Sequence, residues 1–383
     1  MRIRKIGRFC LYLTSTFFLA SLFFLNDLLS NRFFAKRNGI EQNKYSQNVL
    51  VLDLDLHENR NALLTRSTFY EIEIQRAHLY RGMIVNRDLR GKVRSECDSL
   101  LFSSLRYISL KMLDFDATAE EAWQNLKQAF RGGSWYRHPN CRRRSTSRDM
   151  VLGVLAAYTV RGELDQDWQE FIAKTGENRG FIGTGSPDVS LLTPGLASII
   201  KMLDPSALDK LPLPYQKVVS TIEVESLYLQ KGYRAHLFAL RLWLEHRLTK
   251  SRPKVSLFAG LDLIFNTDEE DYFLKQRLSF AASNLYHLDP DNLFFEWLYL
   301  EISESLSPEH KLRLMRKLNS MPQFPKDRLP QNCDRHADYL WQRSSDEYRP
   351  RALFETCHEQ YAGVDFLWMA GLLLEQKPSG TNR

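Results

Sequence analysis

The feature that most constrains this chain is an uncharged apolar run near the amino terminus, from Phe9 to Leu25. Its 17 residues are at the lower limit for a helix that crosses a bilayer, and Leu28-Leu29 can lengthen it. Four basic residues lie within the first eight positions, and such a flank favours the cytoplasmic side. We therefore predict a transmembrane anchor within residues 1–30, in contact with the membrane through residues 9–29, and export of the remaining chain.

A cleaved signal peptide is the alternative interpretation of this leader. Cleavage usually follows a short apolar region that ends in small residues with an A-x-A-like pattern. The small pair Ala20-Ser21 lies inside the apolar run, which favours an uncleaved anchor.

The excess basic charge of the chain is confined to the same leader. Residues 1–37 hold seven basic side chains and one acidic side chain, which account for the whole formal net charge of +6. The other 346 residues hold 45 basic and 45 acidic side chains. Nucleic-acid-binding domains carry their basic surface in the folded part, so we expect no nucleic-acid partner.

The placement of the cysteines agrees with export. Cys10 lies in the predicted span, and four further cysteines follow in the exported part: Cys97, Cys141, Cys333 and Cys357. Disulfides persist in oxidising compartments, and pairing nearest neighbours in the sequence gives Cys97–Cys141 and Cys333–Cys357. The alternative is a metal site built from Cys333, His336, Cys357 and His358. We favour the disulfides and predict neither a metal nor another cofactor.

The rest of the chain separates into a short arm and a long helical region. Residues 31–48 are polar and predict a linker, and residues 377–383 form a tail. In the arm, residues 49–96, alternating patterns predict two β-strands, 49–56 and 69–74; the alternative for the second is a helix that runs to Arg90. Between residues 97 and 376, apolar residues recur at helical spacing, which predicts an all-α domain. The helical segments are 98–113, 119–130, 148–160, 166–174, 189–203, 217–229, 233–248, 270–287, 292–304, 309–318 and 362–375.

Several of these helices begin with an aspartate and carry small residues in the next two turns. Asp98 heads DSLLFSSL, Asp365 heads DFLWMAGL, and Arg148-Asp149 heads a looser version. An aspartate at a helix start accepts backbone N–H bonds. With loops rich in Trp, Arg, His and Pro, this layout resembles the helical (α/α) toroids, of which the six-hairpin glycosidases are the best known. The resemblance covers about residues 97–375 and implies a toroid-like ring with a carbohydrate-sized, acidic pocket at one mouth.

The candidate site residues lie at these helix starts and in the aromatic, basic loops. Glycoside hydrolysis usually uses two carboxyl groups, and the candidate catalytic residues are Asp98, Asp149, Glu296 and Asp365. Arginine can hold a carboxylate, an aromatic ring can stack on a sugar, and histidine can carry a proton. The candidate binding residues are Trp135, Arg137, His138, Arg148, Asp188, Arg234, His236, Trp341 and Arg343. The alternative is structural: Asp149 caps a helix, Arg148 pairs with a neighbouring acid and Trp135 fills a gap.

The sequence thus favours a membrane-anchored, exported domain that binds or hydrolyses envelope glycans. The alternative is a non-catalytic envelope scaffold or protein-interaction module, and an envelope lipid-processing accessory is a third hypothesis. Catalysis requires Asp98, Asp149 and Asp365 to converge on one cavity with Trp or Tyr walls. A scaffold requires these aspartates to be buried at helix starts and an apolar patch to be exposed elsewhere.

Overall fold

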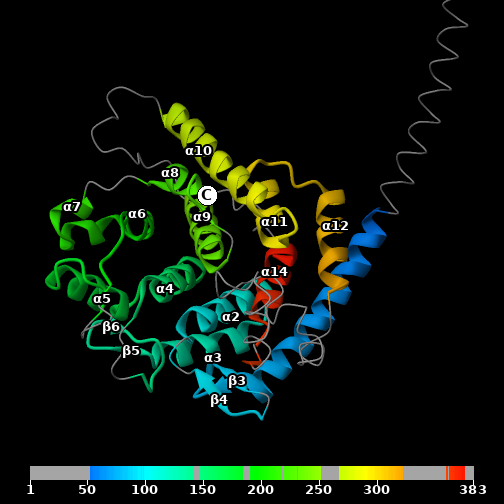
Figure 1. The fold of residues 1–383 in the computed structure, drawn as a ribbon, viewed down its shortest axis with the longest axis horizontal. Helices are drawn as coiled ribbons and strands as arrows, with labels where there is room; N and C mark the ends of the chain where they lie inside the picture. Colours follow the sequence, from blue (N-terminus) through cyan, green and yellow to red (C-terminus); the bar gives the residue numbers. More distant parts are fainter. Residues whose placement is uncertain are drawn as a thin grey trace, which may run out of the picture. The chain divides into compact units, whose positions relative to one another are not determined.

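The computed structural model describes residues 52–88, 90–95, 97, 99–141, 146–183, 190–216, 220–230, 232–251, 267–321, 359–360 and 362–375 (Figure 1). The predicted anchor, linker and tail lie outside these ranges. The chain divides into two compact units, residues 1–58 and 59–383. Of the first unit, the described residues 52–58 are helical, and the remaining results concern the second unit. No helix of the described part is both long and apolar enough to cross a membrane.

Both strands predicted for the arm are wrong where the structure describes them. Residues 52–73 are helical and continue into a π-helical turn, Ile74–His78. A helix forms here because the buried residues are three or four positions apart and so share one helical face. They are Leu63, Ser67, Tyr70 and Ile74, all almost fully buried. The alternative interpretation, a helix, is correct in kind, but the helix ends well before residue 90.

The β structure of the described residues consists of short antiparallel strands, four of which follow this helix within the arm. Strands β1 (Leu79–Tyr80) and β2 (Met83–Ile84) pair antiparallel. Their turn residues, Arg81 and Gly82, both have positive φ, 50° and 74°, as a two-residue hairpin turn requires. A second sheet has the order β4-β3-β7, with β3 (Asn86–Asp88), β4 (Val93–Ser95) and β7 (Glu359–Gln360). A third hairpin joins β5 (Phe130–Arg131) and β6 (Ser134–Trp135).

The region after the arm is mainly helical, as the sequence predicts. Its helices are α2 (Leu100–Met112), α3 (Asp116–Lys127), α4 (Arg148–Arg161), α5 (Gln166–Glu177), α6 (Pro194–Leu203), the 3-10 helix η2 (Pro205–Lys210), α7 (Leu213–Gln216), α8 (Ile222–Ser226), α9 (Tyr233–Ser251), α10 (Thr267–Leu288), α11 (Leu293–Ile302), α12 (Pro308–Asn319) and α14 (Val364–Leu374). Side chains of Asp165, Thr193, Asn292 and Ser307 accept backbone N–H bonds at the starts of α5, α6, α11 and α12. Polar residues of the capping type thus mark these boundaries in the sequence.

Helix α2 is the centre of the core and packs against α3, α4 and α14 (Figure 1). The small residues noted in the sequence lie at these contacts. A Cβ atom on Gly153 of α4 would lie 3.0 Å from the Cα of Leu101, and one on Gly371 of α14 would lie 3.4 Å from the carbonyl oxygen of Ser109. These glycines therefore allow the close packing of α4 and α14 on α2.

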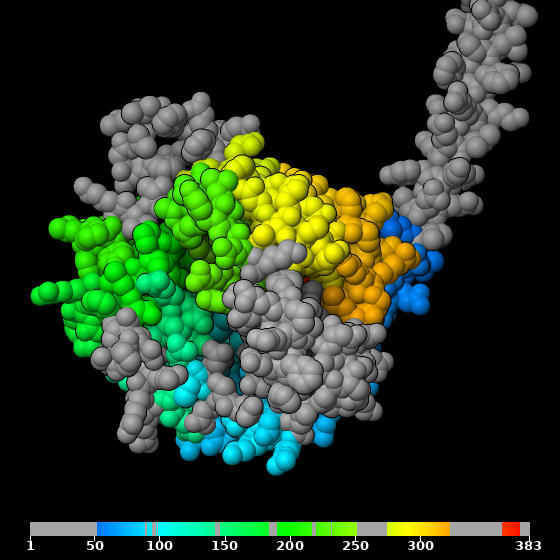
Figure 2. Space-filling model, in the orientation of Figure 1, coloured from blue at the N-terminus to red at the C-terminus, as the bar shows by residue number. Residues whose placement is uncertain are grey.

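On the other side of α9, helix α10 packs against α8, α9 and α11. In the space-filling view, α10, α11 and α12 form a continuous stretch of surface (Figure 2). Tyr286 of α10 stacks on Tyr299 of α11, with ring centroids 5.2 Å apart. Helix α9 therefore lies between the α4–α6 pair and α10, in contact with all three.

The contact between α5 and η2 supplies a test of the packing. A Cβ atom on Gly176 would lie 2.0 Å from the carbonyl oxygen of Lys210, and backbone cannot yield as a side-chain end can. We expect Gly176→Ala to lower the free energy of unfolding by about 3 kcal/mol, the upper end of overpacking costs. Gly371→Ala is the matched helical control, because the atom nearest to its added carbon is the flexible end of Met112. Urea unfolding followed by tryptophan fluorescence measures the free energy of unfolding of both variants. Equal losses in the two variants would contradict the prediction.

Candidate functional site

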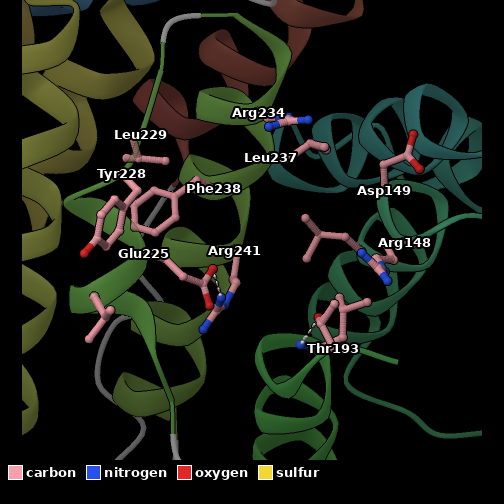
Figure 3. Close-up of a pocket in the computed structure, with 13 residues that line it drawn as sticks. Arg148, Asp149, Thr193, Glu225, Tyr228, Leu229, Arg234, Leu237, Phe238 and Arg241 are labelled. Carbon is pink, nitrogen blue, oxygen red and sulfur yellow. Dashed lines mark hydrogen bonds and ion pairs between the residues drawn. The ribbon is translucent and has the colours of Figure 1, made fainter. Parts of the chain in front are cut away.

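An open groove of about 480 Å³ lies between α4, α6, α8 and α9 (Figure 3). Most of its lining is apolar: Leu152, Leu196, Val224, Tyr228, Leu229, Leu237 and Phe238. Its polar lining residues are Arg148, Asp149, Thr193, Glu225, Arg234 and Arg241. The groove thus brings together three residues predicted from the sequence, Arg148, Asp149 and Arg234, which come from the starts of two helices.

The first turn of α4 forms one wall. Ser147 is at the N-cap, and its hydroxyl donates to the Asp149 carboxylate, so Asp149 does not itself cap the helix. The Arg148 Nε donates to the carbonyl oxygen of Leu191 at 3.1 Å, and the side chain is otherwise exposed. Among the described residues, no carboxylate pairs with Arg148. The expected structural roles, a capping aspartate and an arginine paired with an acid, are therefore not what the structure shows for these residues.

The first turn of α9 lies across the groove. The Arg234 guanidinium is 5.9 Å from the centre of the Tyr233 ring, and its Nε lies 3.3 Å from the Tyr233 hydroxyl oxygen. The hydrogen bond to this hydroxyl raises the pKa of Arg234 above its ordinary value. Arg234 is exposed and, within the described ranges, has no carboxylate partner. Figure 3 shows Arg234 and Asp149 on opposite sides of the groove entrance.

A buried arginine that the sequence interpretation did not single out lies deeper in the groove. Arg241 of α9 donates from Nε to Oε1 of Glu245 at 2.9 Å and from Nη1 to Oε2 of Glu225 at 2.5 Å. Burial alone would lower the pKa of Arg241, but the charges of Glu245 and Glu225 more than offset this, so the pKa is raised. A Cβ atom on Gly195 would lie 2.3 Å from Nη1, so the guanidinium rests directly on the first turn of α6.

Three predicted residues of the loop before α4 do not line the groove. Trp135 is fully buried and packs against Phe130, with ring centroids 5.0 Å apart. His138 is also fully buried; its Nε2 is 3.1 Å from the Tyr80 carbonyl oxygen, and its Nδ1 accepts the Asn140 N–H at 3.1 Å. Backbone groups thus engage both ring nitrogens. Arg137 is half-buried and lies in the same loop, outside the groove lining.

The predicted residues of the later helices also lie elsewhere. Glu296 in the first turn of α11 is 5% exposed, and its Oε1 lies 2.5 Å from Nη1 of Arg313 on α12. Asp365 is buried in the first turn of α14. His236 is 1% exposed and lies beside Phe295, with ring centroids 5.0 Å apart. The groove therefore collects one of the predicted catalytic acids, Asp149. The remaining candidates, Asp98, Asp188, Trp341 and Arg343, lie outside the described residues.

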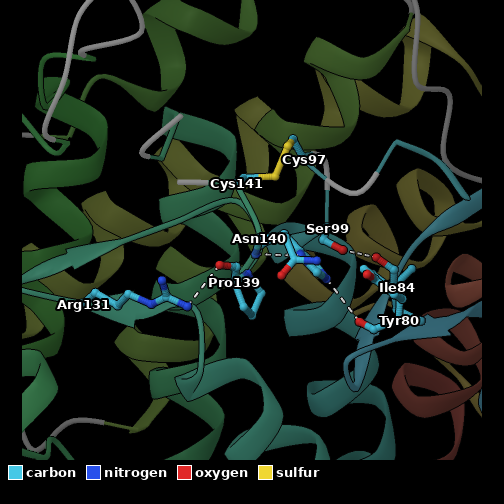
Figure 4. The surroundings of a disulfide bond; sticks show 9 residues. Tyr80, Ile84, Cys97, Ser99, Arg131, Pro139, Asn140 and Cys141 are labelled. Atoms are coloured by element: carbon cyan, nitrogen blue, oxygen red, sulfur yellow. Dashed lines mark hydrogen bonds between the residues drawn. A yellow bond between two sulfur atoms is a disulfide. The ribbon is translucent and has the colours of Figure 1, made fainter. Parts of the chain in front are cut away.

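One of the two predicted disulfides is present. Cys97 and Cys141 are bonded, with their Cα atoms 5.6 Å apart (Figure 4). The bond links the segment directly before α2 to the segment before α4, and both helices belong to the core. The second predicted pair, Cys333–Cys357, and the alternative metal site at the same residues lie outside the described ranges. Within those ranges, no group of three or more His, Cys, Asp or Glu could hold a metal ion.

Comparison with known proteins identifies no relative. No protein-family model, no curated protein and no solved structure matches this chain. The resemblance to the (α/α) toroids is therefore established only as far as a mainly helical fold.

Proposed function

We propose that this protein is a protein-interaction module whose groove binds an acidic, amphipathic segment of a partner protein. The observation that carries the proposal is the pairing of exposed Arg148 and Arg234, which lack carboxylate partners among the described residues, with an apolar floor. Guanidinium groups bind carboxylates with good geometry, and leucine and phenylalanine side chains favour an apolar ligand face. A segment that presents acidic residues beside apolar ones satisfies both.

Exposed apolar side chains beside the groove support a macromolecular partner. Val224, Leu227 and Tyr228, on α8 and directly after it, are 58%, 61% and 79% exposed. Val224 and Tyr228 also line the groove, so its apolar lining continues onto the surface. Exposed apolar surface rimmed by polar residues is typical of interaction sites. Of the three aspartates that a scaffold would bury at helix starts, Asp365 is buried, Asp149 is half-buried and Asp98 lies outside the described residues.

Glycan hydrolysis has less support in this groove and stays a prediction. Its described lining holds two acids, Asp149 and Glu225, and Glu225 is already paired with Arg241. A sugar also needs many polar partners, whereas most of the exposed surface of this lining is apolar. A toroid-like layout remains part of the proposal, because the starts of α4, α6 and α9 border one groove, as they would at one mouth of a ring.

We further infer that the protein is a single-pass membrane protein with its helical domain exported. The apolar run between residues 9 and 29 and the basic residues before it support the anchor. The Cys97–Cys141 bond supports an oxidising compartment, since disulfides are rare in the cytosol. The partner is then a protein of the cell envelope.

A phage-displayed library of random dodecapeptides tests the interaction proposal, with the detergent-solubilised full-length chain as bait. We expect selection of peptides in which Asp or Glu alternates with Leu or Phe. The double variant Arg148→Gln with Arg234→Gln should bind the selected peptides about tenfold more weakly in fluorescence anisotropy. The matched control removes two exposed arginines elsewhere, Arg90→Gln with Arg179→Gln. Selection of peptides without acidic residues, or equal weakening by the control, would contradict the proposal.

A further inference from the structure

We infer that Arg241 receives a carboxylate of the partner in exchange for Glu225, an inference that rests on the proposed function. Arg241 lines the groove, but its side chain is only 8% exposed. It already holds two carboxylates, one from Glu245 and one from Glu225. A buried guanidinium is costly to leave unpaired, so a ligand that displaces one of these two must supply a carboxylate of its own.

The two resident carboxylates differ sharply in exposure. The Glu245 side chain is 1% exposed, and its Oε2 also accepts the Ser220 hydroxyl at 2.7 Å. The Glu225 side chain also accepts a hydroxyl, that of Thr221, but it is 46% exposed and belongs to the short helix α8. Ion pairs with an exposed partner contribute little net stability, because water competes for the charge. Glu225 is therefore the replaceable partner, and Glu245 is the permanent one.

The surroundings allow this exchange without a change of fold. The absence of a side chain on Gly195 leaves room for the guanidinium, and the bond to buried Glu245 holds Arg241 in place. Helix α8 is held separately, because Nη2 of Arg277 lies 2.6 Å from Oε2 of Glu223. Release of Glu225 thus leaves the groove wall intact. Phe238, one turn before Arg241 on α9, lines the same groove, so the acidic residue should have an apolar neighbour in the bound segment.

Removal of the resident carboxylate is the direct test. With peptides selected from the dodecapeptide library, Glu225→Gln should tighten binding by about threefold, as expected when a weak internal competitor is removed. Asp149→Asn removes another carboxylate of the same groove and measures the general effect of charge. We expect Asp149→Asn to tighten binding clearly less. Equal tightening by both variants, or none by Glu225→Gln, would overturn the exchange at Arg241.

A second variant tests the receiving group. Arg241→Met with Glu245→Met removes both buried charges together and so avoids leaving one unpaired. With the acidic residues of a selected peptide neutralised one at a time, this double variant should still prefer the acidic form at the positions that Arg148 and Arg234 bind. At one further position the original protein should prefer the acidic form about tenfold, and the double variant should have lost that preference. If it keeps that preference, the exchange is refuted and the proposed function stands on Arg148 and Arg234. If the original protein selects no acidic peptide, both proposals fall.

Discussion

Replacing Cys97 and Cys141 together by alanine is expected to lower the free energy of unfolding by about 4 kcal/mol. The two residues are 44 positions apart in the sequence, and their bond limits the conformations of the unfolded chain. In the chain-entropy description, a closed loop of this length corresponds to about 4 kcal/mol at room temperature. Guanidinium unfolding of the full-length chain, without reductant, measures the loss directly.

The single variants distinguish the bond from the packing of the two side chains. Cys97→Ala alone opens the bond, so it should lose nearly as much stability as the double variant. A reductant should lower the stability of the original protein by more than that of the double variant, which keeps Cys333 and Cys357. Additive losses from the two single variants, or an original protein insensitive to reductant, would show that the cysteines are not paired. That result would also remove the main structural support for an oxidising compartment.

The helical class and much of the helix placement could be predicted from local patterns in the sequence. Apolar spacing and capping residues act within a few positions, as Thr193 and Asn292 show at the starts of α6 and α11. The error at residues 69–74 arose because alternation over six residues also fits one helical face. Tertiary contacts decide that ambiguity, since Tyr70 stacks on Phe366 of α14, with ring centroids 4.1 Å apart. The sequence pattern contains no information on this distant partner.

The candidate site was predictable in part, for a related reason. Arg148, Asp149 and Arg234 lie at helix starts, a position that predicts charged side chains facing a shared surface, and these three line one groove. Glu296 and Asp365 met the same criterion, but the starts of their helices lie away from the groove. Spacing along the chain shows that a residue begins a helix and does not show which other helices begin beside it.

The residues that the sequence interpretation missed, Arg241 and Glu225, depend on a contact between separate helices. Their pairing spans 16 positions and requires α8 to lie against α9. One local signal existed: Arg241 and Glu245 are four residues apart within the apolar stretch of α9. Two charges at this spacing in a buried helix form an ion pair, which indicates a polar site inside the core.

A second large effect is expected from Arg106→Ala, which should lower the free energy of unfolding by about 3–5 kcal/mol. The side chains of Arg106 on α2 and Glu71 on the preceding helix are 3% and 7% exposed. Arg106 donates from Nε to Oε2 of Glu71 at 3.1 Å, and Gln75 donates to the other oxygen at 2.8 Å. Without Arg106, the buried carboxylate keeps a neutral donor and loses the charge that balances it.

Two control variants separate the buried charge from the loss of a contact. Arg106→Met with Glu71→Leu removes both charges and keeps most of the volume, so its stability should lie close to that of the original protein. Glu177→Ala breaks an ion pair with Lys174 whose side chains are 66% and 36% exposed, and should cost less than about 0.5 kcal/mol. If Arg106→Ala lowers the free energy of unfolding no more than Glu177→Ala does, the Arg106–Glu71 pair does not hold the helix of residues 52–73 against α2. If the double variant loses as much as Arg106→Ala, packing rather than charge is responsible.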